Sequence, residues 1–235
     1  MSAPLYRWPA TAKFGRVIPK TKFYEHATIS TTVREKFVNE VQRITWAYKL
    51  ADETIHLRCS STVPEIQVFT VDAKDDDVSE TVLTAIDKAV PFPIIFEIIR
   101  GTGNYAQTRM IAAHKQLGST PPQLSAYFAT DWLPADTPRA PLPPAIDLPS
   151  LYSGLLTPIL PFATRSGEKM SEVIGRMDQA RKLEREIAGL ERRIRSEPQL
   201  NRKVELRRRL RDRTAALAAL TDPAARTTED APWRS

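Results

Sequence analysis

The sequence has only one cysteine, few glycines and no long uninterrupted apolar run. Cys59 is the single cysteine among 235 residues, which excludes an internal disulfide and any cysteine-rich zinc module and fits a reducing compartment. The longest apolar run, residues 92–99, contains Pro93 and Glu97 and is far shorter than the roughly 18 residues of a membrane span. The first residues lack the apolar core of a signal peptide. We therefore expect a cytoplasmic protein without a membrane segment.

Most short motifs that identify enzymes are also absent. The sequence contains no P-loop, no glycine-rich dinucleotide fingerprint, no nucleophile elbow and no helix motif of the zinc proteases. The three histidines, His26, His56 and His114, lie far apart and lack the spacing of metal ligands. We therefore expect no metal site and no cofactor, with Mg²⁺ as the exception if the chain is a metal-dependent nuclease.

The first 132 residues show the patterns of an α+β domain that begins with an extended N-terminal arm. Thr32 and Glu35 form a capping-box pair, which predicts a helix that gives way to a strand at Ile44. Alternating apolar residues at 54–59 predict a strand with Cys59 in the core. The expected fold is α+β, with a mixed sheet of about six strands and two flanking helices. Strands are predicted over 44–50, 54–59, 65–73, 94–99, 105–114 and 125–132, and the second helix over 78–90.

A proline-rich segment and a helical segment follow this domain. Six prolines within residues 133–149 predict a semi-rigid linker, because proline fixes φ and removes a hydrogen-bond donor. Residues 150–222 predict a short docking helix and then an antiparallel coiled-coil hairpin with its bend at Pro198. Residues 223–235 predict a disordered tail. The expected helix–helix interface consists of apolar residues at three- and four-residue steps: Leu183, Ile187, Leu190, Ile194, Leu206, Leu210 and Leu217.

The net positive charge of the chain belongs to the predicted hairpin. Residues 168–220 contain 15 Lys and Arg against nine Asp and Glu, a net +6 that equals the charge of the whole chain. A dense set of arginines is typical of phosphate neutralisation, and the lack of aromatic residues among them favours backbone contacts over base stacking. The alternative is a solvated face or one that binds an acidic protein. The candidate nucleic-acid-binding residues are Arg202, Lys203, Arg207, Arg208, Arg209, Arg211 and Arg213.

The predicted order of elements in the first domain resembles the core of the PD-(D/E)XK nucleases. In those enzymes carboxylates bind a divalent metal, and the lysine of an acid-x-Lys pair positions the attacking water. Asp52 is the candidate for the first acid. Glu65 and Gln67 are one candidate for the second element, and Asp72 and Lys74 are the other. The proline–aspartate pair of that family is missing and a glutamine cannot replace the lysine, and both departures weaken the resemblance. The alternative is that Glu65, Asp72 and Lys74 are ordinary polar residues of a strand.

Several segments occur in the order expected of one known family. They are Ile18–Lys20 with Phe23–Tyr24, Ile44–Leu50, Glu65–Phe69, Ile86–Lys88 leading to Pro93–Glu97, and Gln199–Leu206. Together they resemble an uncharacterised bacterial family catalogued as domain of unknown function 4391. The resemblance implies a genomic setting beside helicases and DNA methyltransferases of restriction-type phage-defence systems. It implies no catalytic residues.

Three functions remain open from the sequence. The first is an accessory subunit that docks on a helicase or DNA methyltransferase and contacts DNA phosphates through the hairpin. The second is a divergent Mg²⁺-dependent nuclease, and the third is a homo-oligomeric scaffold in which the hairpins form a bundle. A nuclease must bring its acidic candidates and Lys74 together at one edge of the sheet.

Overall fold

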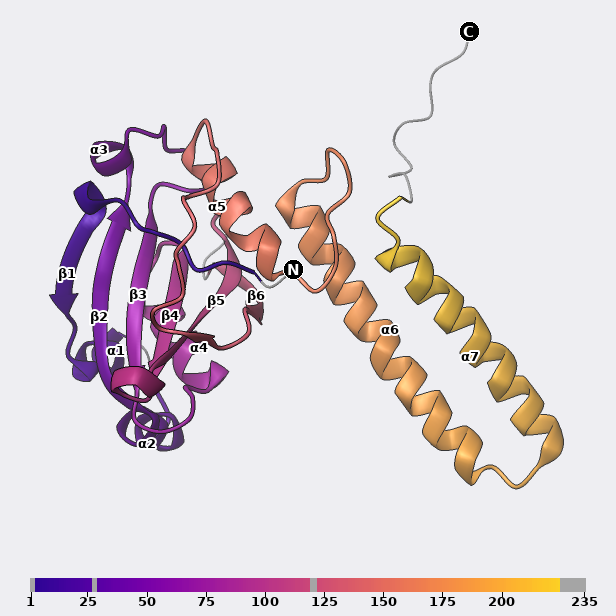
Figure 1. Cartoon of the computed structure of the whole chain (residues 1–235). Helices are drawn as coiled ribbons and strands as arrows, with labels where there is room; N and C mark the ends of the chain where they lie inside the picture. Colours follow the sequence, from indigo (N-terminus) through magenta and orange to yellow (C-terminus); the bar gives the residue numbers. More distant parts are fainter. Residues whose placement is uncertain (1–2, 27–28, 119–121, 225–235) are drawn as a thin grey trace, which may run out of the picture. The chain divides into compact units, whose positions relative to one another are not determined.

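The structure is a computed structural model that describes residues 3–26, 29–118 and 122–224 (Figure 1). The chain divides into two compact units, Met1–Leu160 and Pro161–Ser235. The segment 133–149, expected to be a linker, lies within the first unit. Of the predicted tail, only residues 223 and 224 belong to the described part of the chain.

The first unit is built on one mixed sheet in the order β1-β2-β3-β4-β5-β6, with β7 paired to β5. Neighbouring strands are antiparallel except for β3 and β4, which are parallel. This confirms the predicted α+β class with a mixed sheet. The strands are β1 Lys13–Val17, β2 Val41–Leu50, β3 Ile66–Ala73, β4 Ile94–Arg100, β5 Gln107–Gln116, β6 Gln123–Ala129 and β7 Leu133–Pro134.

Helices cover one face of this sheet. Helix α4 (Glu80–Ala89) forms the crossover between the parallel strands, and its apolar residues Val82, Leu83 and Ile86 are buried. Helices α1 (Lys20–His26) and α2 (Thr31–Glu40) add Phe23 and Phe37 to the same core. Ser30, rather than Thr32, caps α2, since its hydroxyl accepts a hydrogen bond from the Val33 amide at 3.4 Å. The N-terminal segment that was expected to be an extended arm contains strand β1 and helix α1.

The opposite face is covered by two irregular segments that pair with each other. Near the N-terminus, Tyr6 forms a parallel bridge with Ala140, and the Arg7 amide donates to the Ala140 carbonyl at 2.8 Å. The Ala140 amide in turn donates a hydrogen bond to the Leu5 carbonyl at 2.9 Å, and the Leu5 side chain is buried. The prolines of residues 133–149 do not prevent this packing, because one bridge needs only a single unsubstituted amide.

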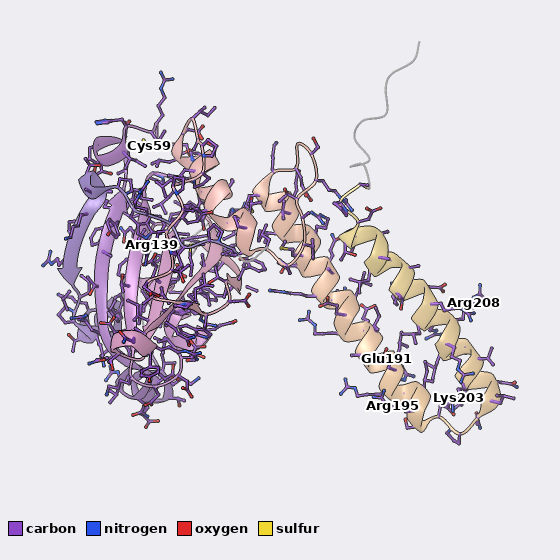
Figure 2. The ribbon with its side chains drawn as sticks, viewed as in Figure 1. Cys59, Arg139, Glu191, Arg195, Lys203 and Arg208 are labelled. Atoms are coloured by element: carbon purple, nitrogen blue, oxygen red, sulfur yellow. The ribbon has the colours of Figure 1, made fainter. Side chains whose placement is uncertain are left out.

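The predicted strand over residues 54–59 is wrong. The short helix α3 (Asp52–Ile55) begins this segment, and His56 ends it in the left-handed region at φ 56°. Thr54 fixes the turn, because its hydroxyl accepts from the Ala51 amide at 2.9 Å and donates to the Lys49 carbonyl at 2.7 Å. Without a strand to place it, Cys59 is exposed rather than in the core (Figure 2).

Helix α5 (Leu148–Leu156) docks on β5, as expected for the first part of the segment 150–222. Asp147 caps it by accepting from the Ser150 amide at 2.8 Å. The buried Tyr152 hydroxyl accepts from the Lys115 amide and donates to the Ala113 carbonyl, both at 2.9 Å. Single turns of 3-10 helix occupy Ala10–Ala12 (η1), Gly103–Tyr105 (η2) and Thr157–Ile159 (η3).

The second unit is a pair of long helices, α6 (Met170–Ser196) and α7 (Leu200–Thr221). They pack together around the expected bend at Glu197–Gln199, and Glu186 of α6 forms an ion pair with Arg213 of α7 at 3.1 Å. Among the seven predicted interface residues, Leu206 is buried and the other six are half-buried. The predicted helical hairpin is therefore confirmed.

Candidate nucleic-acid interface

The five candidate catalytic residues do not come together in the structure. Glu65 and Gln67 lie at the start of β3, where the Gln67 amide donates a short hydrogen bond to Glu65. Asp72 lies near the other end of that strand and pairs with Arg43 at 2.7 Å. At about 3.3 Å per residue, the seven-residue separation of Glu65 and Asp72 corresponds to about 23 Å.

The Glu65 end of β3 is a network of ion pairs. Lys49 of β2 contacts Glu53 of α3 at 2.6 Å and Glu65 at 3.4 Å. The hydrogen bond that Lys49 donates to Glu53 raises the pKa of Lys49, whereas burial opposes this effect. Asp52 is exposed at the start of α3. A lysine already shared between two carboxylates stabilises this corner of the sheet.

The Asp72 end contains the second pair of candidates. Lys74 is exposed, and its backbone amide donates to the Glu40 carbonyl at 2.8 Å. Asp72 accepts from Arg43, so its carboxylate is already neutralised. Within the described residues, no group of three or more His, Cys, Asp and Glu side chains is arranged to hold a metal ion. The acidic candidates and Lys74 therefore lie at two separate ends of the sheet.

Two buried polar networks in the first unit could not be predicted from the sequence. In the first, the Lys115 ammonium lies 3.0 Å from Asp87 and donates to three carbonyls near the end of α4, while the Tyr127 hydroxyl donates to Asp87 at 2.5 Å. Burial raises the pKa of Asp87, and Lys115 opposes that shift. With its bonds formed inside the core, this lysine fixes the end of α4 on the sheet.

The second buried network joins the irregular segments to the centre of the sheet. Glu97 of β4 accepts from the Trp8 indole at 2.8 Å and from the two terminal nitrogens of Arg139 at 2.6 and 3.2 Å. Figure 2 shows Arg139 over the sheet. Arg139 also donates to the Tyr6 carbonyl at 2.8 Å. Because the partners are separated by up to 133 residues, no local pattern could have revealed this contact.

On the second unit, the basic residues of α7 surround the helix instead of forming one stripe. The side of α7 that carries Leu206, Leu210 and Leu217 is called the seam. At about 100° per residue, Arg213 lies beside the seam, Arg207 and Arg209 flank it on opposite sides, and Arg211 lies farther from it. Arg208 is directly opposite the seam, and Figure 2 shows it projecting away from α6. All five of these arginines are exposed.

Among these five arginines, ion pairs with carboxylates involve Arg209 and Arg213. Arg213 pairs with Glu186, and Arg209 pairs with Glu205 at 2.5 Å. Within the part of the chain that the structure describes, no ion pair involves Arg207, Arg208 or Arg211. Because these three arginines are exposed and have no carboxylate partner among the described residues, they are the residues of α7 best suited to bind an anion.

The outer side of α6 is basic as well. Arg185 and Arg192 are exposed and seven residues apart, so they lie on the same side of α6. That side is opposite Ile187, which faces α7, and Lys182 lies close to it. Both helices therefore carry exposed basic residues on their outer sides. These α6 residues were not among the candidates, although the heptad spacing could have identified them.

The open end of the helical pair is held by a buried arginine. Arg176 of α6 contacts Glu168 at 2.7 Å and donates to the Leu220 carbonyl of α7 at 2.9 Å. Burial would raise the pKa of Glu168, but hydrogen bonds from Arg176 and the Arg165 amide lower it below its ordinary value. Arg165 also donates to the Ala219 carbonyl at 2.8 Å. This network fixes α7 to the start of α6.

Fold and site together define an α+β protein with a basic C-terminal helical pair. It belongs to the family described as Domain of unknown function (DUF4391), whose sequence profile matches residues 7–217 and so includes both units. This confirms the resemblance found in the sequence. No curated protein and no solved structure matches the chain. Among the described residues, no helix has both the length and the apolarity needed to cross a membrane.

Proposed function

We propose that this chain is a cytoplasmic accessory subunit that contacts the DNA backbone through its helical pair. The observation that carries the proposal is the outward-facing set of unpaired arginines on α7, Arg207, Arg208 and Arg211. The family resemblance supports a place beside a helicase or DNA methyltransferase in a restriction-type defence system.

The dimensions of the helical pair fit a duplex. Helix α7 has 22 residues and is therefore about 33 Å long at 1.5 Å per residue. This length corresponds to about ten base pairs at 3.4 Å each. Since the basic surface contains no aromatic side chain on which bases could stack, we expect its contacts to be to phosphates.

The charge pattern favours an anionic partner over self-association. If the outer faces of two such helical pairs met in a bundle, the exposed arginines of one copy would lie close to those of the other. Like charges at such distances oppose association, whereas a phosphate backbone neutralises them.

The positions of the catalytic candidates support a non-enzymatic role. Lys49 and Arg43 already neutralise Glu65 and Asp72, at opposite ends of β3. To test the non-enzymatic role, DNA cleavage in the presence of Mg²⁺ is measured first for the unchanged chain and then for the double variant in which Glu65 and Asp72 are replaced by alanine. We expect no Mg²⁺-dependent cleavage of DNA by the unchanged chain, so cleavage that disappears in the double variant would contradict the proposal.

The test of DNA binding is its dependence on salt. Fluorescence anisotropy with a labelled duplex of about 30 base pairs would measure affinity of the full chain at about 50 and 200 mM salt. If about five phosphates are contacted, the affinity should fall by a factor of a few hundred over this range. Two duplexes of unrelated sequence should bind equally. Absence of binding at low salt, or binding that salt does not weaken, would contradict the proposal.

A further inference from the structure

Strand β1 forms an open edge of the sheet in the first unit. Within the described residues it pairs only with β2, and all five of its residues are exposed (Figure 1, indigo). At the other side of the sheet, β6 carries the buried residues Tyr127 and Phe128. An exposed edge strand presents backbone groups to which another extended chain can bind.

The register shows which backbone groups are available. The Ile18 amide donates to the Ile44 carbonyl at 2.9 Å, so Ile18 belongs to a hydrogen-bonded pair with β2. In an antiparallel ladder such pairs alternate with pairs whose N–H and C=O groups point away from the neighbour. Val17, opposite Thr45, therefore directs its amide and carbonyl toward the open edge.

The side chains along this edge are apolar and basic. Phe14 is 43% exposed and Val17 is 56% exposed, although both are large hydrophobic residues. The centroid of the Phe14 ring lies 4.1 Å from the centroid of the half-buried Trp46 ring, so the exposed apolar surface continues from β1 onto β2. Lys13 and Arg16 are the charged residues of the strand, and no acidic residue precedes Glu25 in the sequence.

Protection against aggregation accounts for only part of this pattern. A lysine, a short strand and the bulge between Lys13 and Arg16, where Gly15 has φ 68°, all limit unselective pairing. Exposed Phe14 and Val17 oppose that purpose, because apolar side chains favour the addition of another strand. A second copy of β1 is an unfavourable partner, since it would add two more basic residues and no acidic one to this edge.

We propose that β1 binds an extended acidic segment of a partner protein as an added strand of the sheet. Backbone hydrogen bonds to Val17 would provide the register. Phe14, Trp46 and Arg16 lie on one face of the sheet, and Lys13 and Val17 lie on the other. On each face, the apolar side chains would contact apolar residues of the segment and the basic side chain would pair with a carboxylate. This surface lies in the first unit and does not depend on DNA binding by the helical pair.

The test uses two synthetic peptides of about nine residues, one repeating Val-Val-Glu-Glu and the other Val-Val-Lys-Lys, so that each face of the added strand carries both residue types. NMR spectra of the full ¹⁵N-labelled chain would report hydrogen exchange of the Val17 amide. We expect the glutamate peptide to slow this exchange at least about tenfold and the lysine peptide to have no effect. An unchanged Val17 amide at about 1 mM glutamate peptide, or equal binding of both peptides, would overturn the proposal.

Two sets of variants separate backbone pairing from general attraction. Lys13→Glu with Arg16→Glu should weaken the glutamate peptide at least about tenfold and allow the lysine peptide to bind. Arg58→Glu, a change at an exposed position outside β1, should leave both peptides unaffected. Val17→Pro removes the outward amide without removing a bond to β2, and should abolish binding. If the charge variants bind the glutamate peptide as the unchanged chain does, the proposal is wrong whether or not the proline variant folds.

Discussion

Arg139 and Glu97 join parts of the first unit that are 42 residues apart in the sequence. Glu97 is a buried carboxylate on a central strand, and its neutralisation depends on a residue from the proline-rich segment. Removal of one partner of a buried ion pair leaves the other without compensation. This single side chain therefore links the packing of the irregular segments to the stability of the sheet.

Arg139→Ala should lower the free energy of unfolding by about 2–3 kcal/mol, because it leaves the Glu97 carboxylate buried with only the Trp8 indole as donor. Urea denaturation of the full chain measures this change. Arg139→Ala combined with Glu97→Gln is the matched control, since it also removes the charge. If the double variant is no more stable than the single one, the carboxylate is not the cause of the loss.

His114 makes the stability depend on pH. Burial lowers the pKa of His114 below its ordinary value of 6.5, and its ring stacks on Tyr152 with centroids 5.7 Å apart. The unfolded chain therefore binds the proton first as pH falls. The stabilising contribution is complete above pH 6.5 and is lost as pH falls from there through the lower pKa of the folded state.

Replacement of His114 by phenylalanine should therefore flatten the decline in the urea midpoint between about pH 7 and 5. The ring contact with Tyr152 is retained in that variant, so the comparison isolates the titration. An equally steep decline in His114→Phe would show that other groups cause it. Glu168 is one such group, but its pKa is lowered below 4.5 and it acts only at more acidic pH.

Among the elements, those with strong local patterns were predicted correctly. The strand at 66–73 and the strand at 94–100 lie in the centre of the sheet, and their nearly continuous apolar residues reflect burial on both faces. The helical pair was also predictable, since apolar residues recur at three- and four-residue steps on both sides of Pro198. In these elements the local pattern and the tertiary environment agree.

The elements that were missed depend on contacts distant in sequence. Alternation at Ile55, Leu57 and Cys59 mimics a strand, but hydrogen bonds of Thr54 form a helical turn first. The prolines of residues 133–149 predict a linker, yet Ala140 pairs with the N-terminal segment. The two ends of β3 could not be distinguished in sequence as separate ion-pair networks, because their partners come from β2 and α3.

The helical pair depends on the Arg176 network at its open end. Arg176→Ala removes the contacts to Glu168 and to the Leu220 carbonyl. Because the buried Glu168 would lose its partner, we expect the last turns of α7, near residues 215–221, to exchange amide hydrogens at least about tenfold faster. Hydrogen exchange followed by mass spectrometry measures this. Protection of α7 that matches the unchanged chain would contradict the role given to Arg176, and amides of β3 provide the internal control.

For the molecule as a whole, the two units differ in charge. The excess of basic residues is confined to the second unit, whereas the first is balanced and places its charged side chains in internal networks. This division matches an accessory subunit in which one unit supplies a folded platform and the other reaches an anionic partner.

The central claim is that the outward arginines of α7 contact DNA phosphates. Two triple variants with equal loss of charge test it most directly: Arg207, Arg208 and Arg211 changed to alanine, and Arg193, Arg209 and Arg213 changed to alanine. The second set lines the groove between α6 and α7, where Arg209 and Arg213 are already paired with carboxylates.

The measurement is the slope of log affinity against log salt concentration for the full chain with duplex DNA. The outward triple variant should reduce the magnitude of this slope by about 2–3, since each phosphate contact contributes about 0.9. The groove variant should change it by less than about 1. Equal slopes for both triple variants would show that only total charge matters and would contradict the assignment of the outward face.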